Sequence, residues 1–458
     1  MGRKFDFDYI IIGSGPAGST AARILAQNKK IRVAIIENYI YGGSNLGTRD
    51  IPYLVGQSFA HTFYNLQQSP AIGAQKLHFN YPAAISHQTA VAKLLGAGDK
   101  KSLEDIGVTC IEGSAKFLDD HTIAVNEQTF TSNFFIIATG STLATSNISG
   151  LNTVDYLTPI TAFKLRHLPK LIVIVGGGAT GCEIAEYYAK LGIKVIIMEQ
   201  SSRLLPNEDP EAGNTLRDYF AHELGIIVAT DSKVLAIEND GVAKRIIFKS
   251  GQQEKMVRIE HVVLATGSVP ATANLDLKNA GVRTRESGAI MANKLFQTTA
   301  KNIYAIGDCL GNVNSSTERA EYEGSILADN LLHKTKNIVS YKGFIRLVNT
   351  DPQIASVGRT EAKLEKKRIK YAKAVIDIKS LPASTVDGLD YGFIKLIISR
   401  RTNHILGATI MAPGAALMTE ELSLALRHHI SIRELASTPH IANSYNCAIK
   451  LAAKQLVK

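Results

Sequence analysis

The chain has 458 residues, a length that favours about three domains. A content of 45% hydrophobic and 20% charged residues is typical of a soluble protein with several sizeable cores. No apolar run approaches the roughly 18 residues that cross a bilayer, and the apolar stretch after the basic start is too short for a signal peptide. We therefore expect a cytoplasmic protein without a membrane span.

The formal net charge of +10 does not by itself indicate a nucleic-acid partner. The densest basic cluster, residues 363–368, contains an acid and no aromatic residue, which favours the solvated face of a helix. The four cysteines, Cys110, Cys182, Cys309 and Cys447, form no closely spaced pair. Their spacing argues against a disulfide framework and a zinc site, so we expect reduced thiols, no metal and no nucleic acid.

Residues 8–37 follow the order strand, glycine-rich turn, helix, strand. The apolar residues 8–12 predict a buried strand, residues 21–27 a helix, and residues 32–36 a second strand. The turn between the first strand and the helix reads Gly13-Ser14-Gly15-Pro16-Ala17-Gly18. This is the pattern of a turn that binds the pyrophosphate of a dinucleotide.

Each glycine of this turn has a physical function. Gly13 permits the tight turn, Gly15 lets the backbone approach a pyrophosphate, and Gly18 lets helix and strand pack closely. The start of the helix offers free N–H groups and a positive dipole end to the phosphates. We place Pro16 and Ala17, at this helix start, in the same site.

Residues 171–199 repeat the pattern, with an apolar strand at 171–175, a helix at 182–191 and a strand that ends in an acid. The residues predicted to bind a dinucleotide in this second copy are Gly176, Gly178, Gly181 and Glu199. Glu37 and Glu199 each follow the last strand of a copy, where a carboxylate can accept the ribose hydroxyls of an adenosine. Two copies with strand, helix and terminal acid in register argue against an accidental match.

Two dinucleotide sites predict a flavin together with a nicotinamide. Residues 135–141 and 262–268 are apolar strands that both run into Ala-Thr-Gly, as expected for the strand that closes each copy. We place Thr139, Gly140 and Gly267 in these sites. Residues 303–308 predict one more buried strand, whose terminal Asp308 can accept hydrogen bonds from a ribityl chain.

With these motifs the chain resembles the pyridine nucleotide-disulfide oxidoreductases, the family of dihydrolipoamide dehydrogenase, glutathione reductase and mercuric reductase. The resemblance extends over nearly the whole chain, including residues 41–44, 302–308 and 349–358. It implies FAD and NAD(P)H as cofactors, a homodimer, and Asp308 as the ribityl ligand. The further residues that it assigns to FAD are Gly43, Ala115, Thr317 and Ala320.

The resemblance also implies an α/β fold of two Rossmann-like, three-layer dinucleotide-binding domains with a C-terminal α+β interface domain. The expected FAD-binding domain comprises residues 1–150 and 275–343. The expected NAD(P)-binding domain comprises residues 151–274, and the interface and dimerisation domain residues 344–458.

The chain departs from the family where the redox disulfide belongs. The ungapped register places Asn45 and Asp50 at the two cysteine positions, and Leu54 where the family has a lysine. Near the C-terminus, Thr438 and Asn443 stand at the positions of the family's His and Glu. Disulfide exchange needs a thiolate and a base that moves its proton, and both are replaced together. We therefore expect no dithiol reaction.

Three residues are candidates for catalysis in the absence of the thiols. Glu183 matches the family's acid near the flavin, and Arg49 could replace its missing lysine or be a surface cation. Asp50 could steer an acceptor or assist a proton transfer, or it could be a residue of the helix surface without such a role. His440 could replace the family's histidine, although an interface histidine bound to a backbone carbonyl is the favoured interpretation.

Glu199 favours NADH, because a carboxylate accepts a free 2′-hydroxyl and repels a 2′-phosphate, and Arg203 stands four positions further on. The favoured function is an NADH:acceptor oxidoreductase that delivers electrons directly to a small-molecule acceptor: a quinone, a dye, a metal ion or oxygen. A soluble pyridine nucleotide transhydrogenase and a non-catalytic FAD-binding sensor or assembly subunit are the alternatives.

Overall fold

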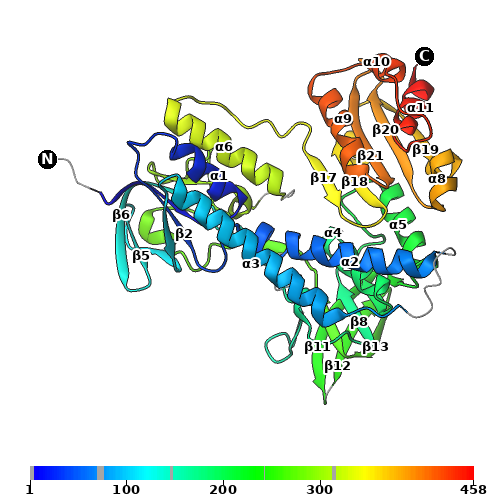
Figure 1. The fold of residues 1–458 in the computed structure, drawn as a ribbon, viewed down its shortest axis with the longest axis horizontal. Helices are drawn as coiled ribbons and strands as arrows, with labels where there is room; N and C mark the ends of the chain where they lie inside the picture. The colour runs from blue at the N-terminus through cyan, green and yellow to red at the C-terminus, as the bar shows by residue number, and fades with distance from the viewer. Residues whose placement is uncertain (1–4, 70–76, 145–147, 242, 312–315, 458) are drawn as a thin grey trace. The chain divides into compact units, whose positions relative to one another are not determined.

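The computed structural model describes residues 5–69, 77–144, 148–241, 243–311 and 316–457 (Figure 1). The chain divides into two compact units. The first unit comprises Met1–Gly56, Pro82–Ala144 and Gly267–Tyr341, and the second comprises Gln57–Tyr81, Thr145–Thr266 and Lys342–Lys458. None of the described helices is long and apolar enough to cross a membrane.

The first unit is built on a sheet in which β3, β2, β1 and β6 are parallel neighbours in that order, with β16 also parallel beside β6. Two antiparallel strands, β5 and β4, extend the sheet beyond β6. The strands of this sheet are β1 (Phe7–Ile12), β2 (Val33–Glu37), β3 (Thr109–Glu112), β4 (Ala115–Phe117), β5 (Thr122–Val125), β6 (Gln128–Ile137) and β16 (Ile303–Ala305).

Successive residues of β1 enter different cores, as the period of two of a strand requires. Ile11 belongs to the core that contains α1 residues, whereas Ile10 belongs to the core on the other face. The remaining elements of the first unit are α1 (Pro16–Leu25), η1 (Ser44–Thr48), most of α3 (Tyr81–Asp105), β7 (Ser141–Leu143), β15 (Ser268–Pro270), η4 (Leu277–Ala280), η5 (Gly307–Leu310) and α6 (Thr317–His333). Helix α2 (Asp50–Gln68) begins in this unit and ends in the second.

Helices α1 and α6 lie side by side (Figure 1). Gly324 makes this close packing possible, because a Cβ atom at that position would lie 2.4 Å from the Ala17 carbonyl oxygen. The sequence pattern predicted a helix only from residue 21, whereas α1 already begins at Pro16. The glycine-rich turn itself therefore forms the first turn of the helix.

The second unit contains a parallel sheet in the order β10-β9-β8-β14 and an antiparallel three-stranded sheet, β11-β12-β13. Its helix α4 likewise begins three residues before the predicted start. The elements of this part are η3 (Ala162–Lys164), β8 (Leu171–Val175), α4 (Ala179–Lys190), β9 (Lys194–Met198), α5 (Pro210–His222), β10 (Ile227–Ala229), β11 (Ser232–Asp240), β12 (Ala243–Ser250), β13 (Gln253–Ile259) and β14 (His261–Leu264).

The C-terminal part of the second unit is a five-stranded antiparallel sheet in the order β17-β18-β21-β20-β19. Helices α9 and α11 pack on this sheet around one hydrophobic core. Its elements are β17 (Ile345–Val348), β18 (Gln353–Gly358), α7 (Glu361–Lys366), β19 (Tyr371–Asp377), η6 (Ile378–Ser380), α8 (Pro382–Asp387), β20 (Phe393–Ser399), β21 (Ile405–Ala412), α9 (Ala415–Arg427), α10 (Ile432–Ser437) and α11 (Cys447–Leu456).

A buried ionic joint connects the two parts of the second unit. Lys395 of β20 is fully buried, and its Nζ atom lies 2.8 Å from Glu211 Oε2 and 3.3 Å from Asp209 Oδ2 at the start of α5. The same ammonium group contacts Glu361 at the start of α7. Nearby, Arg346 of β17 forms two hydrogen bonds, of 2.7 and 2.8 Å, with the carboxylate of Glu208. Buried charges are stable only when they are paired in this way.

Candidate dinucleotide sites and active site

The first glycine-rich turn joins β1 to α1 in the geometry that a dinucleotide requires. A Cβ atom on Gly13 would lie 2.4 Å from the Ala138 carbonyl oxygen, and one on Gly18 would lie 2.0 Å from the Gly13 carbonyl oxygen. In contrast, a Cβ atom on Gly15 would meet no atom within 4 Å. Gly15 is the N-cap of α1, Pro16 follows as its first residue, and no side chain caps this helix. The backbone at this helix start is therefore open to a phosphate.

The second turn, between β8 and α4, has the same construction. A Cβ atom on Gly176 would lie 2.3 Å from the Ala265 carbonyl oxygen, and one on Gly181 would lie 1.9 Å from the Gly176 carbonyl oxygen. Gly178 is the N-cap of α4, no side chain caps the helix, and a Cβ atom there would meet no atom within 4 Å. Both turns thus combine two tightly packed glycines with one glycine that faces open space.

The two strand-end acids are fixed by the backbone of their own glycine turns. Glu37 Oε2 accepts hydrogen bonds from the N–H (3.0 Å) and the hydroxyl (2.7 Å) of Ser14. Glu199, which is only 6% exposed, accepts from the N–H groups of Gly177 and Ser201, both at 2.6 Å. Each carboxylate is therefore held beside the turn that would bind the phosphates. Ser14 is a positioning residue that the glycine pattern alone did not indicate.

Asp308 lies in the short helix η5, just after β16, rather than within a strand as the sequence suggested. Its Oδ2 atom accepts a hydrogen bond of 3.0 Å from the Ser141 hydroxyl. The fully buried Glu323 of α6 accepts from the Gly307 N–H at 2.7 Å and from the Tyr341 hydroxyl at 2.7 Å. Glu323 thereby fixes the turn that carries Asp308, and sequence reasoning gave it no such role.

The other residues assigned to cofactor binding surround these motifs. A Cβ atom on Gly43 would lie 2.9 Å from the Gly15 Cα atom, so the two glycines approach closely. The buried Thr139 hydroxyl has no hydrogen-bond partner among the described residues, which fits a polar group of a ligand. The remaining assigned residues occupy the start of β4, the turn after β6, the loop before β15 and the first turn of α6: Ala115, Gly140, Gly267, Thr317 and Ala320.

Two catalytic candidates, Arg49 and Asp50, lie where η1 gives way to α2. Arg49 Nε lies 2.7 Å from Asp50 Oδ1, so the two charges form an ion pair. The Thr317 hydroxyl lies 3.5 Å from Asp50 Oδ2. The structure thus brings Asp50 next to a residue of the predicted FAD site and pairs Arg49 with the Asp50 carboxylate.

Glu183 lies in the first half of α4, and its Oε1 atom accepts a hydrogen bond of 2.8 Å from the Asn349 N–H. His440 is 2% exposed at its side chain, its Nδ1 atom lies 3.0 Å from the Thr438 carbonyl oxygen, and Nε2 lies 3.2 Å from Glu421 Oε1. The Nδ1 contact agrees with the expected hydrogen bond from His440 to a backbone carbonyl.

All four cysteines are free thiols. Cys182 and Cys309 are fully buried, and burial raises the pKa of both thiols well above the usual value. Burial also raises the pKa of Cys110, which is partly exposed. Because the thiolate is the reactive form, these environments disfavour disulfide exchange. Among the described residues there is also no group of three or more His, Cys, Asp or Glu side chains able to hold a metal ion.

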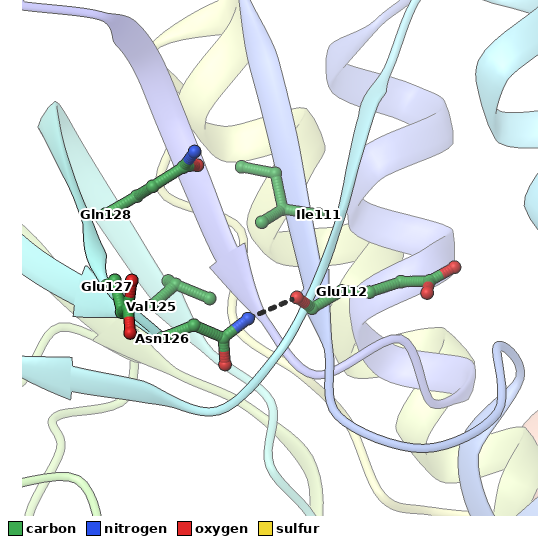
Figure 2. A pocket seen from close by; sticks show the side chains of 6 residues that line it. All are labelled: Ile111, Glu112, Val125, Asn126, Glu127 and Gln128. Atoms are coloured by element: carbon green, nitrogen blue, oxygen red, sulfur yellow. Dashed lines mark hydrogen bonds between the residues drawn. The ribbon is translucent and has the colours of Figure 1, made fainter.

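A surface pocket of about 390 Å³ lies where β3 ends and β5 turns into β6 (Figure 2). Glu112 of this pocket stands opposite Glu37 in the pairing of β3 with β2. The Asn126 side-chain amide donates a hydrogen bond of 3.1 Å to the Glu112 carbonyl oxygen (Figure 2). None of the residues predicted to act in catalysis lines this pocket, so we assign no part of the chemistry to it.

Two glycine turns at helix starts, each with an acid held beside it, define a protein that binds two dinucleotides. Comparison with known proteins gives its family. Residues 7–324 match the model of the pyridine nucleotide-disulphide oxidoreductases, and residues 345–453 match the dimerisation domain of the same family. The chain belongs to the pyridine nucleotide-disulphide oxidoreductase family, so the expected fold class and the FAD and NAD(P)H cofactors are confirmed.

Curated relatives and solved structures extend this result. Mercuric reductase from Streptomyces lividans is 32% identical over 98% of this chain and 96% of the relative. Dihydrolipoyl dehydrogenase from Bacillus subtilis is 28% identical over 94% of this chain and 93% of the relative. A Cu(II) complex of a cysteine-to-serine variant of the HOCl-induced flavoprotein disulfide reductase RclA from Escherichia coli superposes with a TM-score of 0.89 at 25% identity. It covers 99% of this chain and 100% of that structure.

Proposed function

We propose that this protein is an FAD-dependent NADH:acceptor oxidoreductase that passes electrons directly to a non-disulfide acceptor. The observation that carries the proposal is the Arg49–Asp50 ion pair at the start of α2, where the family register would place a redox cysteine. Residues 1–109 contain no cysteine at all. A carboxylate paired with a guanidinium cannot relay electrons as a disulfide does, so the acceptor has to be reduced without one.

The residues of the two turns account for cofactor binding. FAD, when bound, supplies the two-electron chemistry that accepts hydride from NADH and reduces the acceptor. The first unit would hold it through the turn at Gly15, the carboxylate of Glu37 and the carboxylate of Asp308. The second unit would hold NADH through the turn at Gly178, and Glu183 would lie near the reacting rings as the family acid. We propose the boundaries 1–150 with 275–343, 151–274 and 344–458 for the three domains.

The surroundings of Glu199 support NADH over NADPH. Its carboxylate is fixed by two backbone N–H groups and would repel a 2′-phosphate. Arg203, the nearest arginine along the chain, donates from Nη2 to the carbonyl oxygens of Pro206 (3.0 Å) and Glu208 (3.2 Å). This guanidinium is thereby engaged with the backbone of its own loop rather than presented as a phosphate clamp.

Asp50 would act on the acceptor. Its carboxylate is about one-third exposed, so it can meet a small molecule from solvent and hold or deliver a proton. The acceptor classes that fit are quinones, dyes, metal ions and oxygen. Metal ions are of particular interest because several relatives are named mercuric reductases and a structural relative was solved as a Cu(II) complex. The dimerisation domain supports a homodimer as the assembly.

An anaerobic titration tests the proposal. The purified protein should be yellow and should bleach fully with one equivalent of NADH, without a long-wavelength band from a thiolate beside the flavin. Uptake of a second equivalent by the unaltered protein would show a disulfide and contradict the proposal. No bleaching would favour a non-catalytic FAD-binding subunit. Rapid reoxidation by a nicotinamide analogue, but not by quinone, ferricyanide, Cu(II), Hg(II) or oxygen, would favour a transhydrogenase.

A gain-of-function variant checks the register. In the double variant Asn45→Cys with Asp50→Cys, the two thiols stand at the positions of the family's pair. Oxidised N45C/D50C should take up a second equivalent of NADH and develop a long-wavelength band, whereas the single variants should not. If the double variant stays at one equivalent, these positions are not the equivalents of the family's cysteines.

A further inference from the structure

Helix α4 carries two buried ionisable side chains, Glu186 and Lys190, one and two turns after Glu183. Glu186 is fully buried, and the Lys190 side chain is 1% exposed. The Lys190 Nζ atom lies 3.5 Å from Glu186 Oε1. Burial of a charge costs free energy unless partners compensate for it, and a hydrophobic pair would often serve stability equally well. The pair therefore suggests a function other than stabilisation of the fold.

The partners of this pair lie in the turn 349–351, at the start of the segment 349–358 that resembles the family. The Asp351 N–H donates to both carboxylate oxygens of Glu186, at 2.9 and 3.0 Å. Two residues earlier, the Asn349 N–H donates to Glu183 Oε1 at 2.8 Å. The Gln57 side chain of α2 donates to the Asn349 carbonyl oxygen. One short turn thus joins the proposed acid Glu183 to the buried Glu186.

Lys190 closes the network through the Asp351 side chain. Its Nζ atom lies 2.9 Å from Asp351 Oδ2, and the His61 Nδ1 atom lies 2.5 Å from the same oxygen. Lys190 also lies 3.3 Å from His61 Nδ1 and 5.7 Å from the centre of the Tyr64 ring. The ammonium group therefore contacts the turn, α2 and its own helix at once.

We propose that Lys190 is a positioning residue of the hydride-transfer site. Through Asp351 and Glu186, Lys190 holds the turn 349–351 against α4. The Asn349 N–H of this turn then fixes the carboxylate of Glu183. The inference rests on the role of Glu183 in the proposed function. A carboxylate held by a backbone N–H keeps one orientation, and the rate of a reaction between positioned groups falls steeply when one of them shifts by about 1 Å.

The charges of the network agree with this arrangement. Burial raises the pKa of Glu186 to about 7. The Lys190 charge opposes this rise, and the Asp351 charge adds to it. Although burial opposes it, the His61 hydrogen bond and the Lys190 charge lower the pKa of Asp351 to about 2. Lys190 and Asp351 are therefore both charged at neutral pH, whereas Glu186 gains its charge gradually around neutral pH. The other titratable groups around Glu186 are His61 and Tyr64 of α2, Cys182 and Glu183 of α4, and Tyr219 of α5.

The test compares two buried lysines of the same unit. Lys190→Met removes the charge from this network, and Lys395→Met removes a charge from the ionic joint with Asp209, Glu211 and Glu361. Three quantities are measured for FAD-loaded protein: the limiting rate of anaerobic bleaching by NADH, the NAD⁺ dissociation constant by calorimetry, and the free energy of unfolding. Both variants should be destabilised, because each leaves buried carboxylates without their cation.

K190M should lower the limiting rate about tenfold or more, with a smaller change in NAD⁺ affinity, whereas K395M should stay within about twofold of the unaltered protein. If K190M acts through Glu183, the double variant E183Q/K190M should be no slower than E183Q. Equal rates for K190M and K395M, or additive losses in the double variant, would overturn the inference. Failure of the unaltered protein to bleach would instead count against the proposed function, so the two failures are distinguishable.

Discussion

Substitution of Gly178 tests whether the second turn binds a pyrophosphate. Gly178 has the extended backbone of an N-cap residue, with φ −74°, and a Cβ atom there would meet no protein atom within 4 Å. Gly178→Ala should therefore change the free energy of unfolding by no more than about 0.5 kcal/mol. The methyl group would, however, occupy the space in front of α4 that the phosphates need. A loss of about 1–3 kcal/mol of NAD⁺ binding free energy would raise the NAD⁺ dissociation constant by roughly fivefold to 150-fold.

Gly181→Ala is the matched comparison within the same turn. Its Cβ atom would lie 1.9 Å from the Gly176 carbonyl oxygen. An ordinary carbon–oxygen contact is about 3.3 Å, so helix and turn would have to separate by about 1.4 Å. Overpacking of this kind costs about 1–3 kcal/mol of stability.

Calorimetry with NAD⁺ and denaturant unfolding of the FAD-loaded protein separate the two effects. G178A should lose affinity at unchanged stability, and G181A should lose stability. Unaltered NAD⁺ affinity of G178A, or equal destabilisation of both variants, would refute the assignment of the open glycine to the ligand.

Two further predictions concern single carboxylates. The kcat/KM of the unaltered protein for NADH should be at least about tenfold above its kcat/KM for NADPH. Glu199→Ala should lower this ratio. An unchanged ratio would show that Glu199 does not discriminate between NADH and NADPH. Glu186, with its pKa raised from 4.5 to about 7 in the folded chain, binds more protons folded than unfolded between these values. The free energy of unfolding of the unaltered protein, relative to Glu186→Gln, should therefore fall as the pH rises from about 4.5 to about 7 and then level off, as measured by denaturant titration. If the difference in free energy of unfolding between the two proteins did not change with pH, the raised pKa of Glu186 would be contradicted.

The sequence was most informative where chemistry and local geometry coincide. Both glycine turns could be placed from spacing alone, because a tight turn, a close helix and an open phosphate site each require glycine at a fixed position. The helix starts were missed by a few residues, since residues 179–181 of the predicted phosphate-binding turn also form the first turn of α4. Asp308 was predicted at the end of a strand, but it lies in a short helix after that strand.

The network of Lys190 could not have been predicted in the same way. His61, Glu186 and Asp351 are far apart in the sequence and meet only when α2, α4 and the turn before β18 pack together. A lysine four residues after a glutamate is typical of an exposed helix face, so the pattern itself favours solvent. Only the burial of both side chains distinguishes this pair from such a surface pair.

The ionic joint at Lys395 bears on how this protein can be divided for experiments. A cut between the nucleotide-binding and C-terminal parts of the second unit would leave Lys395 and Glu361 in one fragment and the carboxylates of Asp209 and Glu211 in the other. Asp209 and Glu211 would then lose their shared cation, and Lys395 would keep only Glu361 as a partner. The two family matches meet between residues 324 and 345, and separate expression of the two parts should yield less stable fragments than the joined chain.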